Sequence, residues 1–158
     1  MRKYILADNQ ELTRFAVESL IKQRGQEAIY KASDKAGLVE LLKEHENAVV
    51  VLDYTLFDFA DVEQLLIITE RFALSQWILI SDELTPAFLR SVVYASHQFS
   101  IVFKDGSLHE LREALQATDR HDRYISQRAL EVIINHQQEE EQPSVLTSTE
   151  IESVKATP

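Results

Sequence analysis

The sequence contains no cysteine, and this absence excludes several kinds of site at once. Disulfide bonds, zinc–thiolate sites, iron–sulfur clusters and thiol nucleophiles all depend on that residue. Glycine is also rare, because only 3 occur and they stand far apart, at Gly25, Gly37 and Gly106. A glycine-rich turn that cradles the phosphates of a nucleotide is therefore not expected.

Positive charge is scarce as well. The 158 residues include 16 Lys and Arg against 26 Asp and Glu, which gives a formal net charge of −10. Such a surface argues against direct binding to DNA, RNA or anionic lipid. No apolar run approaches the ~18 residues of a membrane span, and the N-terminus turns acidic at Asp8 before a signal peptide could form. We therefore expect a cytoplasmic chain with no membrane partner.

Apolar residues make up 45% of the chain, enough for the core of one domain. Short apolar runs alternate with longer amphipathic segments. The runs cover residues 4–7, 28–30, 48–52, 77–80 and 101–103. They are continuous and several are rich in β-branched or aromatic residues, which is typical of strands buried on both faces of a parallel sheet.

The amphipathic segments between these runs predict helices. In the first, Leu12, Phe15, Ala16 and Leu20 recur at helical spacing, with Gly25 expected to end the helix. The other helices are marked by apolar stripes or by capping residues: Ser33 or Asp34 before residues 38–42, a stripe over 62–69, Thr85-Pro86, and Ser107 before Leu108, Leu111 and Leu115. Five strand–helix units in this order predict an α/β fold, a five-stranded parallel sheet with helices on both faces.

Polar groups follow four of the predicted strands. Ligands of such sheets bind at the carboxyl ends of the strands, so these groups are expected to share one pocket. They are Asp8-Asn9 after the first strand, Asp53 after the third, Ser81-Asp82 after the fourth and Lys104-Asp105 after the fifth. The pocket would then hold two carboxylates, a hydroxyl and an ammonium.

This set of groups suits phosphoryl transfer. Two close carboxylates repel each other, and a divalent cation that prefers oxygen, most plausibly Mg²⁺, would keep both ionised. Asp53 would act as a carboxylate nucleophile toward a phosphoryl group. Lys104 and Ser81 would contact the phosphoryl oxygens, whose negative charge grows during transfer. The expected product is an aspartyl phosphate.

These strand-end motifs also carry a family resemblance. Residues 1–121 resemble the receiver domain of a bacterial two-component response regulator. The matching motifs are Ile5-Leu6-Ala7-Asp8, Val49-Val50-Val51-Leu52-Asp53, Ile78-Leu79-Ile80-Ser81 and Val102-Phe103-Lys104. The resemblance implies a flavodoxin-like (βα)5 fold with strand order 2-1-3-4-5, and a sensor histidine kinase as the phosphoryl donor.

The resemblance also assigns roles to residues. It implies that Asp53 is the phosphoacceptor, that Ser81 is the hydroxyl of the site and that Lys104 binds the phosphoryl group. Asp8 stands at the first position of the paired acids that hold the metal, and Asn9 at the second. The backbone carbonyl of Thr55 would be a further metal ligand.

The C-terminal part of the sequence extends the resemblance to one type of response regulator. Arg123-Tyr124-Ile125-Ser126 and Leu146-Thr147-Ser148-Thr149-Glu150-Ile151-Glu152 resemble the linker and opening helix of NarL/LuxR-type regulators, which carry a DNA-binding helix-turn-helix domain. We expect a receiver over 1–121, a linker helix (about 126–137) and acidic linker over 122–145, and the start of a truncated helix-turn-helix domain over 146–158. The chain is thus interpreted as an N-terminal fragment that would form a homodimer and reach DNA only through the missing domain.

Three residues depart from the family pattern. Asn9 replaces an Asp or Glu, which keeps an oxygen ligand but removes a negative charge, so weaker Mg²⁺ binding and slower phosphorylation are expected. Phe57 stands where proline is common, which predicts a different shape for residues 54–58. Ile101 replaces the Tyr or Phe that rotates inward on phosphorylation, which leaves open how Ser81 would be coupled to the outer surface.

Other functions remain open at this point. Asn9 and Ile101 are also compatible with a degenerate receiver that acts through phosphorylation-independent protein contacts. Leu52-Asp53-Tyr54-Thr55 loosely resembles the haloacid-dehalogenase phosphatases, but these need an Asp as general acid where Thr55 stands. A flavin or dinucleotide site is disfavoured because the turn after Asp8 is acidic and lacks glycine. We expect a signalling module that regulates transcription, and not an enzyme.

Overall fold

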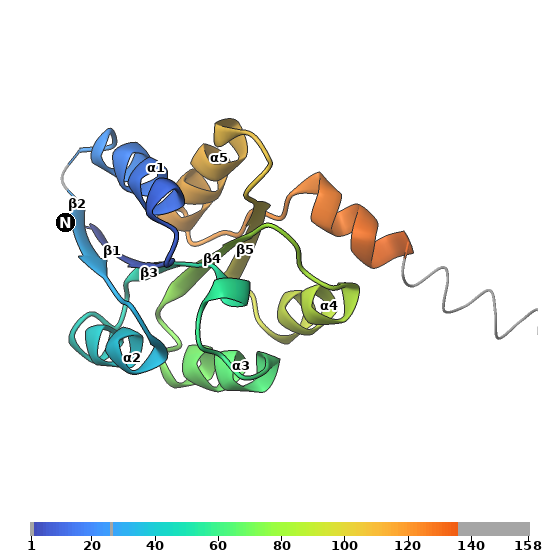
Figure 1. The fold of residues 1–158 in the computed structure, drawn as a ribbon, viewed down its shortest axis with the longest axis horizontal. Helices are drawn as coiled ribbons and strands as arrows, with labels where there is room; N and C mark the ends of the chain where they lie inside the picture. Colours follow the sequence, from blue (N-terminus) through green and yellow to red (C-terminus); the bar gives the residue numbers. More distant parts are fainter. Residues whose placement is uncertain (1, 26, 136–158) are drawn as a thin grey trace, which may run out of the picture. The chain divides into compact units, whose positions relative to one another are not determined.

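The computed structural model describes residues 2–25 and 27–135. Strands and helices alternate along this part of the chain (Figure 1). The elements are β1 (Arg2–Ala7), α1 (Glu11–Lys22), β2 (Glu27–Lys31), α2 (Lys35–Glu44), β3 (Val49–Leu52), the short 3-10 helix η1 (Tyr54–Leu56), α3 (Val62–Arg71), β4 (Gln76–Ser81), α4 (Pro86–Ala95), β5 (Phe99–Phe103) and α5 (Leu108–Asp119). A further helix covers residues 127–135.

The five strands form one parallel sheet in the order β2-β1-β3-β4-β5. Helices α1 and α5 cover one face, and α2, α3 and α4 cover the other (Figure 1). Each strand–helix–strand connection crosses over the sheet, as parallel pairing requires. The predicted fold class and strand order are therefore confirmed.

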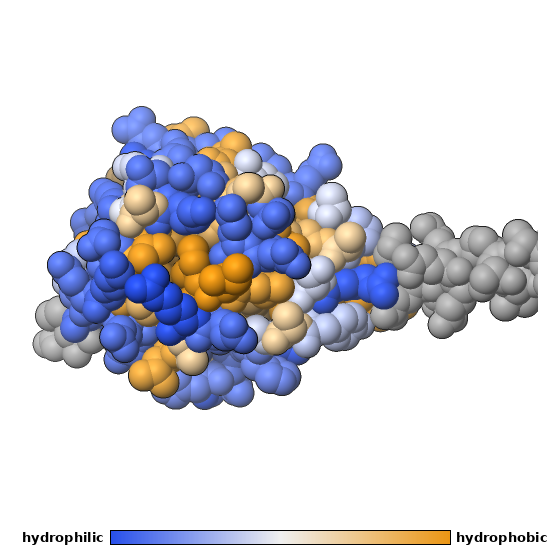
Figure 2. Space-filling view, turned by 90° about the horizontal axis from the view of Figure 1, so that it is seen from below, coloured by the Kyte–Doolittle hydropathy of each residue, from blue (hydrophilic) through white to orange (hydrophobic). Residues whose placement is uncertain are grey.

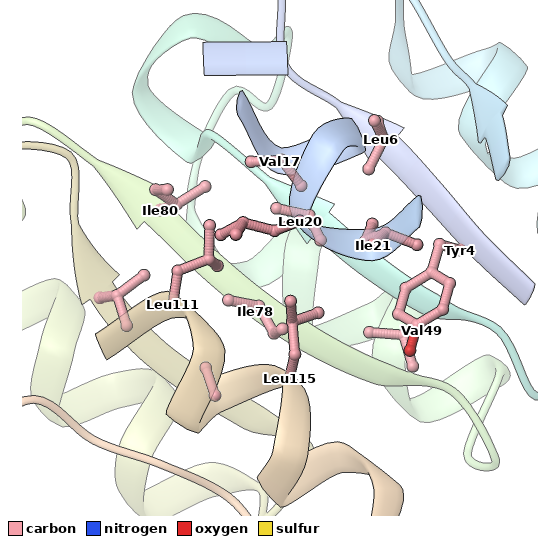
Figure 3. Close-up of a cluster of buried hydrophobic side chains, with 13 residues drawn as sticks. Tyr4, Leu6, Val17, Leu20, Ile21, Val49, Ile78, Ile80, Leu111 and Leu115 are labelled. Atoms are coloured by element: carbon pink, nitrogen blue, oxygen red, sulfur yellow. The ribbon is translucent and has the colours of Figure 1, made fainter. Parts of the chain in front are cut away.

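The central strand β3 and the edge strand β5 are fully buried, which explains their continuous apolar sequence. All four residues of β3 and all five of β5 are buried. A cluster of apolar side chains fills the space between the sheet and the α1–α5 layer (Figure 3). It includes Tyr4, Leu6, Val17, Leu20, Ile21, Val49, Ile78, Ile80, Leu111 and Leu115. Burial of this surface is the main stabilising contribution to the fold, and it fixes the strand ends that form the site.

Capping side chains set the starts of the helices. The side chains of Asp34, Thr85 and Ser107 each accept a hydrogen bond from the backbone N–H three residues later, as the sequence predicts for α2, α4 and α5. Asp34, and not Ser33, is thus the cap of α2. Gly25 lies in the turn after α1 with a φ of +122°, a conformation that side chains other than glycine rarely adopt.

The buried face of α1 differs from the predicted one. Leu12 and Phe15 were expected in the core stripe, but they are 87% and 70% exposed. Leu20 of the predicted stripe is buried, together with Val17 and Ile21, which the prediction did not include. With 3.6 residues per turn, Leu12 and Phe15 point well to one side of this second stripe, so both apolar sets cannot face the sheet together.

The chain after α5 continues along the edge of the sheet. The backbone of Tyr124 and Ser126 hydrogen-bonds to Ile101 of β5, and the first compact unit of the chain ends at Ser126. The helix over 127–135 begins the second unit and agrees with the predicted linker helix up to residue 135. The expected acidic linker over 136–145 and the helix-turn-helix start over 146–158 lie outside the described residues. Among the described residues, none of the helices is long and apolar enough to cross a membrane.

Candidate functional site

The four predicted groups meet at the carboxyl edge of the sheet. Asp8, Asp53 and Lys104 directly follow β1, β3 and β5, and Ser81 is the last residue of β4. Hydrogen bonds continue the sheet past the strand ends, because the N–H of Asp53 donates to Ala7 and that of Lys104 to Ser81. Asp8, Asp53 and Ser81 are 3%, 0% and 0% exposed. Parallel pairing thus brings together residues from four separate segments.

Lys104 contacts both carboxylates of the pocket. Its Nζ lies 3.3 Å from Asp8 Oδ2 and also contacts Asp53 Oδ2. The lysine side chain is only 7% exposed, so its charge is held inside the pocket. The ammonium therefore bridges the two acids and balances part of their repulsion.

The two oxygens of Asp53 have different surroundings. Oδ1 accepts hydrogen bonds from the backbone N–H of Thr55 (3.0 Å), the Thr55 hydroxyl (2.8 Å), the N–H of Leu56 (3.3 Å) and the Ser81 hydroxyl (2.8 Å). Oδ2 is buried and forms an ion pair with the Lys104 ammonium. One oxygen anchors the side chain and caps η1, while the other pairs with Lys104.

The pKa values of the two acids are shifted in opposite directions. Burial raises the pKa of Asp53, but hydrogen bonds from Lys104, Thr55 and Ser81 outweigh it, so its pKa lies below the ordinary value. Burial also raises the pKa of Asp8, and there the Gln10 N–H and Lys104 offset it only in part. The pocket therefore favours the ionised form of Asp53 and disfavours that of Asp8.

Gln10 belongs to the pocket, although no specific sequence pattern selects it. Its backbone N–H donates to Asp8 Oδ1 at 2.8 Å, and its side-chain oxygen accepts a hydrogen bond from Lys104. The first contact is the local turn that an Asp often makes with the backbone two residues later. That tendency is the only sequence signal for Gln10, because its contact with Lys104 joins residues 94 positions apart.

The proposed metal ligands are only partly gathered. Oδ2 of Asp8 and Oδ2 of Asp53 are buried carboxylate oxygens, the kind of ligand that Mg²⁺ prefers, but both lie against the Lys104 ammonium. Asn9 is exposed, and its Nδ2 donates to the Leu56 carbonyl at 3.4 Å. In the described part of the chain, no three acidic or histidine side chains gather in a way that could hold a metal ion. The pocket therefore offers two carboxylates to Mg²⁺, and the described residues form no preassembled metal site around them.

The two other departures from the family pattern take up structural positions. Phe57 is buried, and its ring lies 6.1 Å from that of Phe59, so the loop after Asp53 is held by aromatic packing. Ile101 is 0% exposed, and its backbone N–H and carbonyl pair with Tyr124 and Ser126. Position 101 is thus a packed core position with both backbone groups already engaged.

A groove between α3 and α4 lacks the groups of this pocket. It has a volume of about 580 Å³ and is lined by Leu66, Ile67 and Ala95 together with Glu63 and Glu70. Ile67 is 64% exposed, and apolar side chains gather on the molecular face shown in Figure 2. With no lysine, arginine or histidine among its lining residues, this groove is not suited to phosphoryl transfer.

Comparison with known proteins identifies the fold. No protein-family model and no curated protein sequence match the chain. Solved structures do match it, among them a LuxR-family two-component response regulator from Aurantimonas sp. SI85-9A1, which is 22% identical with a TM-score of 0.73 over 85% of this chain and 96% of that one.

The isolated receiver domain of RcsB from Salmonella enterica serovar Typhimurium, solved with the phosphomimetic BeF3−, is 19% identical, with a TM-score of 0.72 over 84% of this chain and 98% of that one. The non-phosphorylated RcsB receiver domain from Escherichia coli is 22% identical, with a TM-score of 0.66 over 80% and 98%. At these identities the likeness is one of fold. The chain has the receiver fold of RcsB and LuxR-family response regulators.

Proposed function

We propose that this chain is a response-regulator receiver that accepts a phosphoryl group on Asp53 from a sensor histidine kinase and so controls an output domain. The observation that carries the proposal is the state of the Asp53 carboxylate. It is buried, its pKa is lowered, Oδ1 is anchored by Thr55, Leu56 and Ser81, and Oδ2 faces Lys104. The receiver fold of the structural neighbours supports the same function.

The transfer step uses an electron pair of Asp53 Oδ2. This oxygen forms a bond to phosphorus while the bond from phosphorus to the donor imidazole nitrogen breaks, and the bonding pair leaves with the imidazole. Lys104 is close enough to Oδ2 to balance charge on the phosphoryl oxygens, and the Ser81 hydroxyl can donate to them. The lowered pKa keeps Asp53 ionised at neutral pH, which a nucleophile requires.

Asp8 and Asp53 would hold Mg²⁺ in this proposal, together with the side-chain oxygen of Asn9 and the backbone carbonyl of Thr55. The cation, when bound, supplies positive charge beside the phosphoryl group. Asn9 contributes no negative charge where the family has an acid, so we expect weaker binding of the metal. This part of the proposal is supported by the two buried Oδ2 atoms of Asp8 and Asp53, which now contact the Lys104 ammonium and would share it with the metal.

Phosphorylation can be tested directly by intact mass. The chain is incubated with a small phosphodonor such as phosphoramidate and with Mg²⁺, and we expect a gain of one phosphoryl group. Asp53→Ala should abolish the gain, while Asp82→Ala, which removes an exposed carboxylate next to Ser81, should keep it. No gain in the unmodified chain, or an equal gain in Asp53→Ala, would contradict the proposal.

A degenerate receiver is the second candidate, and one observation favours it. Lys104 contacts Asp8 and Asp53 together, so the pocket already contains a cation that offsets their repulsion. A Mg²⁺ titration followed by addition of beryllofluoride separates the two functions, since a degenerate receiver should respond to neither. A hydrolase is not proposed, because Thr55 presents to Asp53 a hydroxyl and not the carboxyl of a general acid.

The output side of the proposal concerns residues beyond the receiver. We propose that the chain is cytoplasmic, with 122–145 as a linker, and that residues 146–158 begin a helix-turn-helix domain through which a homodimer would bind DNA and regulate transcription. One structural neighbour was solved as RcsB dimers bound to DNA. Light scattering of the chain with and without beryllofluoride and Mg²⁺ tests the dimer, and a chain that stays monomeric in both states would contradict it.

A further inference from the structure

We propose that helix α4 relays the phosphorylation state of Asp53 to residues 123–126, through Tyr54 at its first turns and Arg123 at its last turn. This inference rests on the proposed phosphorylation of Asp53 and concerns how that site would be read out. Residues 123–126 are called the linker strap below. They directly precede the helix over 127–135, so a change in the strap would reach whatever follows the receiver.

The first contact of the relay is aromatic. Tyr54 follows Asp53 directly and is the first residue of η1. Its ring lies 4.3 Å from the ring of Phe88 in α4, measured between centroids, and 5.9 Å from that of Phe59. Phe88 is 8% exposed, so the ring pair is held on the α4 side by core packing. A shift of Tyr54 would therefore act on α4.

The Asp53 carboxylate acts on η1, the short helix that begins at Tyr54. The carboxylate caps η1 by accepting hydrogen bonds from the N–H groups of Thr55 and Leu56 on Oδ1. In an acyl phosphate formed through Oδ2, Oδ1 becomes a neutral carbonyl oxygen, and neutral acceptors form weaker hydrogen bonds than carboxylates. The Ser81 hydroxyl would also turn toward the phosphoryl oxygens. The cap of η1 therefore weakens, and the backbone that carries Tyr54 becomes freer to shift against Phe88.

The second contact lies at the other end of α4. Arg123 Nη1 donates hydrogen bonds to the carbonyls of Val93 (2.8 Å) and Ser96 (3.1 Å), which belong to the last turn and the C-cap of the helix. Helix C-termini carry carbonyls without intrahelical partners and a partial negative charge, so an arginine is well suited to this position. Arg123 ties the C-terminus of α4 to the linker strap.

The strap is also joined to the edge of the sheet. The N–H of Ile101 donates to the Tyr124 carbonyl (2.8 Å), and the N–H of Ser126 donates to the Ile101 carbonyl (3.0 Å). The N–H of Tyr124 donates to the Ser100 hydroxyl at 3.0 Å. These bonds close the outer edge of β5 at the position where the family pattern has a mobile aromatic ring. Tyr54 and Phe88 thus provide the aromatic contact that Ile101 does not.

The relay predicts that phosphorylation loosens the strap. Hydrogen exchange of the Tyr124 and Ser126 amides, followed by mass spectrometry, measures this directly. In the phosphorylated chain we expect these amides to exchange at least about threefold faster, a change larger than usual deviations from additivity. Phe88→Leu should still take up the phosphoryl group, seen by intact mass, but its strap should no longer respond. Tyr94→Leu, which changes a ring that is 65% exposed on the same helix, should keep the full response.

A second measurement needs no phosphorylation. Exchange of the strap amides is compared in Phe88→Leu, Arg123→Met and the double variant, all without phosphodonor. Coupled residues should give a double variant that differs by more than about threefold from the product of the two single effects. This arm remains decisive if the chain takes up no phosphoryl group, a result that would refute the proposed function.

Four results would overturn the relay. The phosphorylated chain could show unchanged strap exchange, or Phe88→Leu could keep the full response. Tyr94→Leu could lose the response as completely as Phe88→Leu. Finally, the effects of Phe88→Leu and Arg123→Met could simply multiply in the unphosphorylated chain.

Discussion

The strand-end pocket and the outer edge of β5 differ in how closely they follow the family pattern. In the pocket, Asp8, Asp53, Ser81 and Lys104 all stand where the pattern has them, and only Asn9 departs from it. At the β5 edge, Ile101 replaces the expected aromatic ring and is fully buried under the linker strap.

The difference reflects what each region requires. Phosphoryl transfer needs particular groups at particular atoms, because a carboxylate, a hydroxyl and an ammonium cannot replace one another. Transmission of a small shift needs only side chains that are packed against each other, and different residues can provide this. Under the proposed function, the pocket is therefore constrained by chemistry, whereas the β5 edge is constrained by packing.

The largest expected effect is on the rate of phosphorylation, and it comes from a change in the pocket, at Lys104. Lys104→Met removes the ammonium beside Asp53 Oδ2, and we expect the rate of phosphorylation by phosphoramidate to fall about 100-fold, as losses of a single stabilising donor typically do. The rate is measured by intact mass against time. Lys43→Met, which changes an exposed lysine paired with Glu40, should leave it unchanged. A rate within threefold of the unmodified chain would contradict the role of Lys104.

The next effect tests the β5 edge. Ile101→Ala removes a fully buried side chain, and we expect the free energy of unfolding in urea to fall by about 2–5 kcal/mol. The rate of phosphorylation should change little, because Ile101 pairs with Leu79 in the sheet and with the linker strap, and not with a pocket residue. If Ile101→Ala instead stopped phosphorylation while the chain remained folded, the comparison drawn above would fail.

The smallest effect concerns the charge of Asp8. Its pKa is raised in the folded chain, chiefly by burial, so ionised Asp8 lowers stability at neutral pH. Asp8→Asn should raise the free energy of unfolding at pH 7, by less than Ile101→Ala lowers it, because the amide carries no charge to bury.

The pH dependence of this gain provides its check. As the pH falls below the raised pKa of Asp8, the carboxyl becomes neutral in the unmodified chain, and the advantage of Asn should disappear. Urea unfolding of both chains from pH 7 down to acidic pH measures it. Asp122→Asn alters an exposed acid near Arg120 and should give almost no difference. A loss of stability in Asp8→Asn at pH 7 would show that its charge is needed for the fold.

The sequence predicted the pocket better than the helix surfaces. Asp8, Asp53, Ser81 and Lys104 could be placed together because each follows a recognisable strand and parallel strands share one carboxyl edge. For α1 the same reasoning failed, since Leu12 and Phe15 form a plausible apolar stripe but lie exposed. An amphipathic pattern shows that a helix has an apolar face, yet two overlapping stripes cannot be ranked without the sheet that they pack against.

By itself the sequence determined the alternation of strands and helices, the caps at Asp34, Thr85 and Ser107, and the polar residue at each strand end. These follow from local periodicity and from the handedness of the connections. Only the tertiary structure decided that Gln10 reaches Lys104, 94 positions away, and that Arg123 caps α4 across 30 positions. Such contacts depend on distances through space between separate elements, which local patterns do not encode.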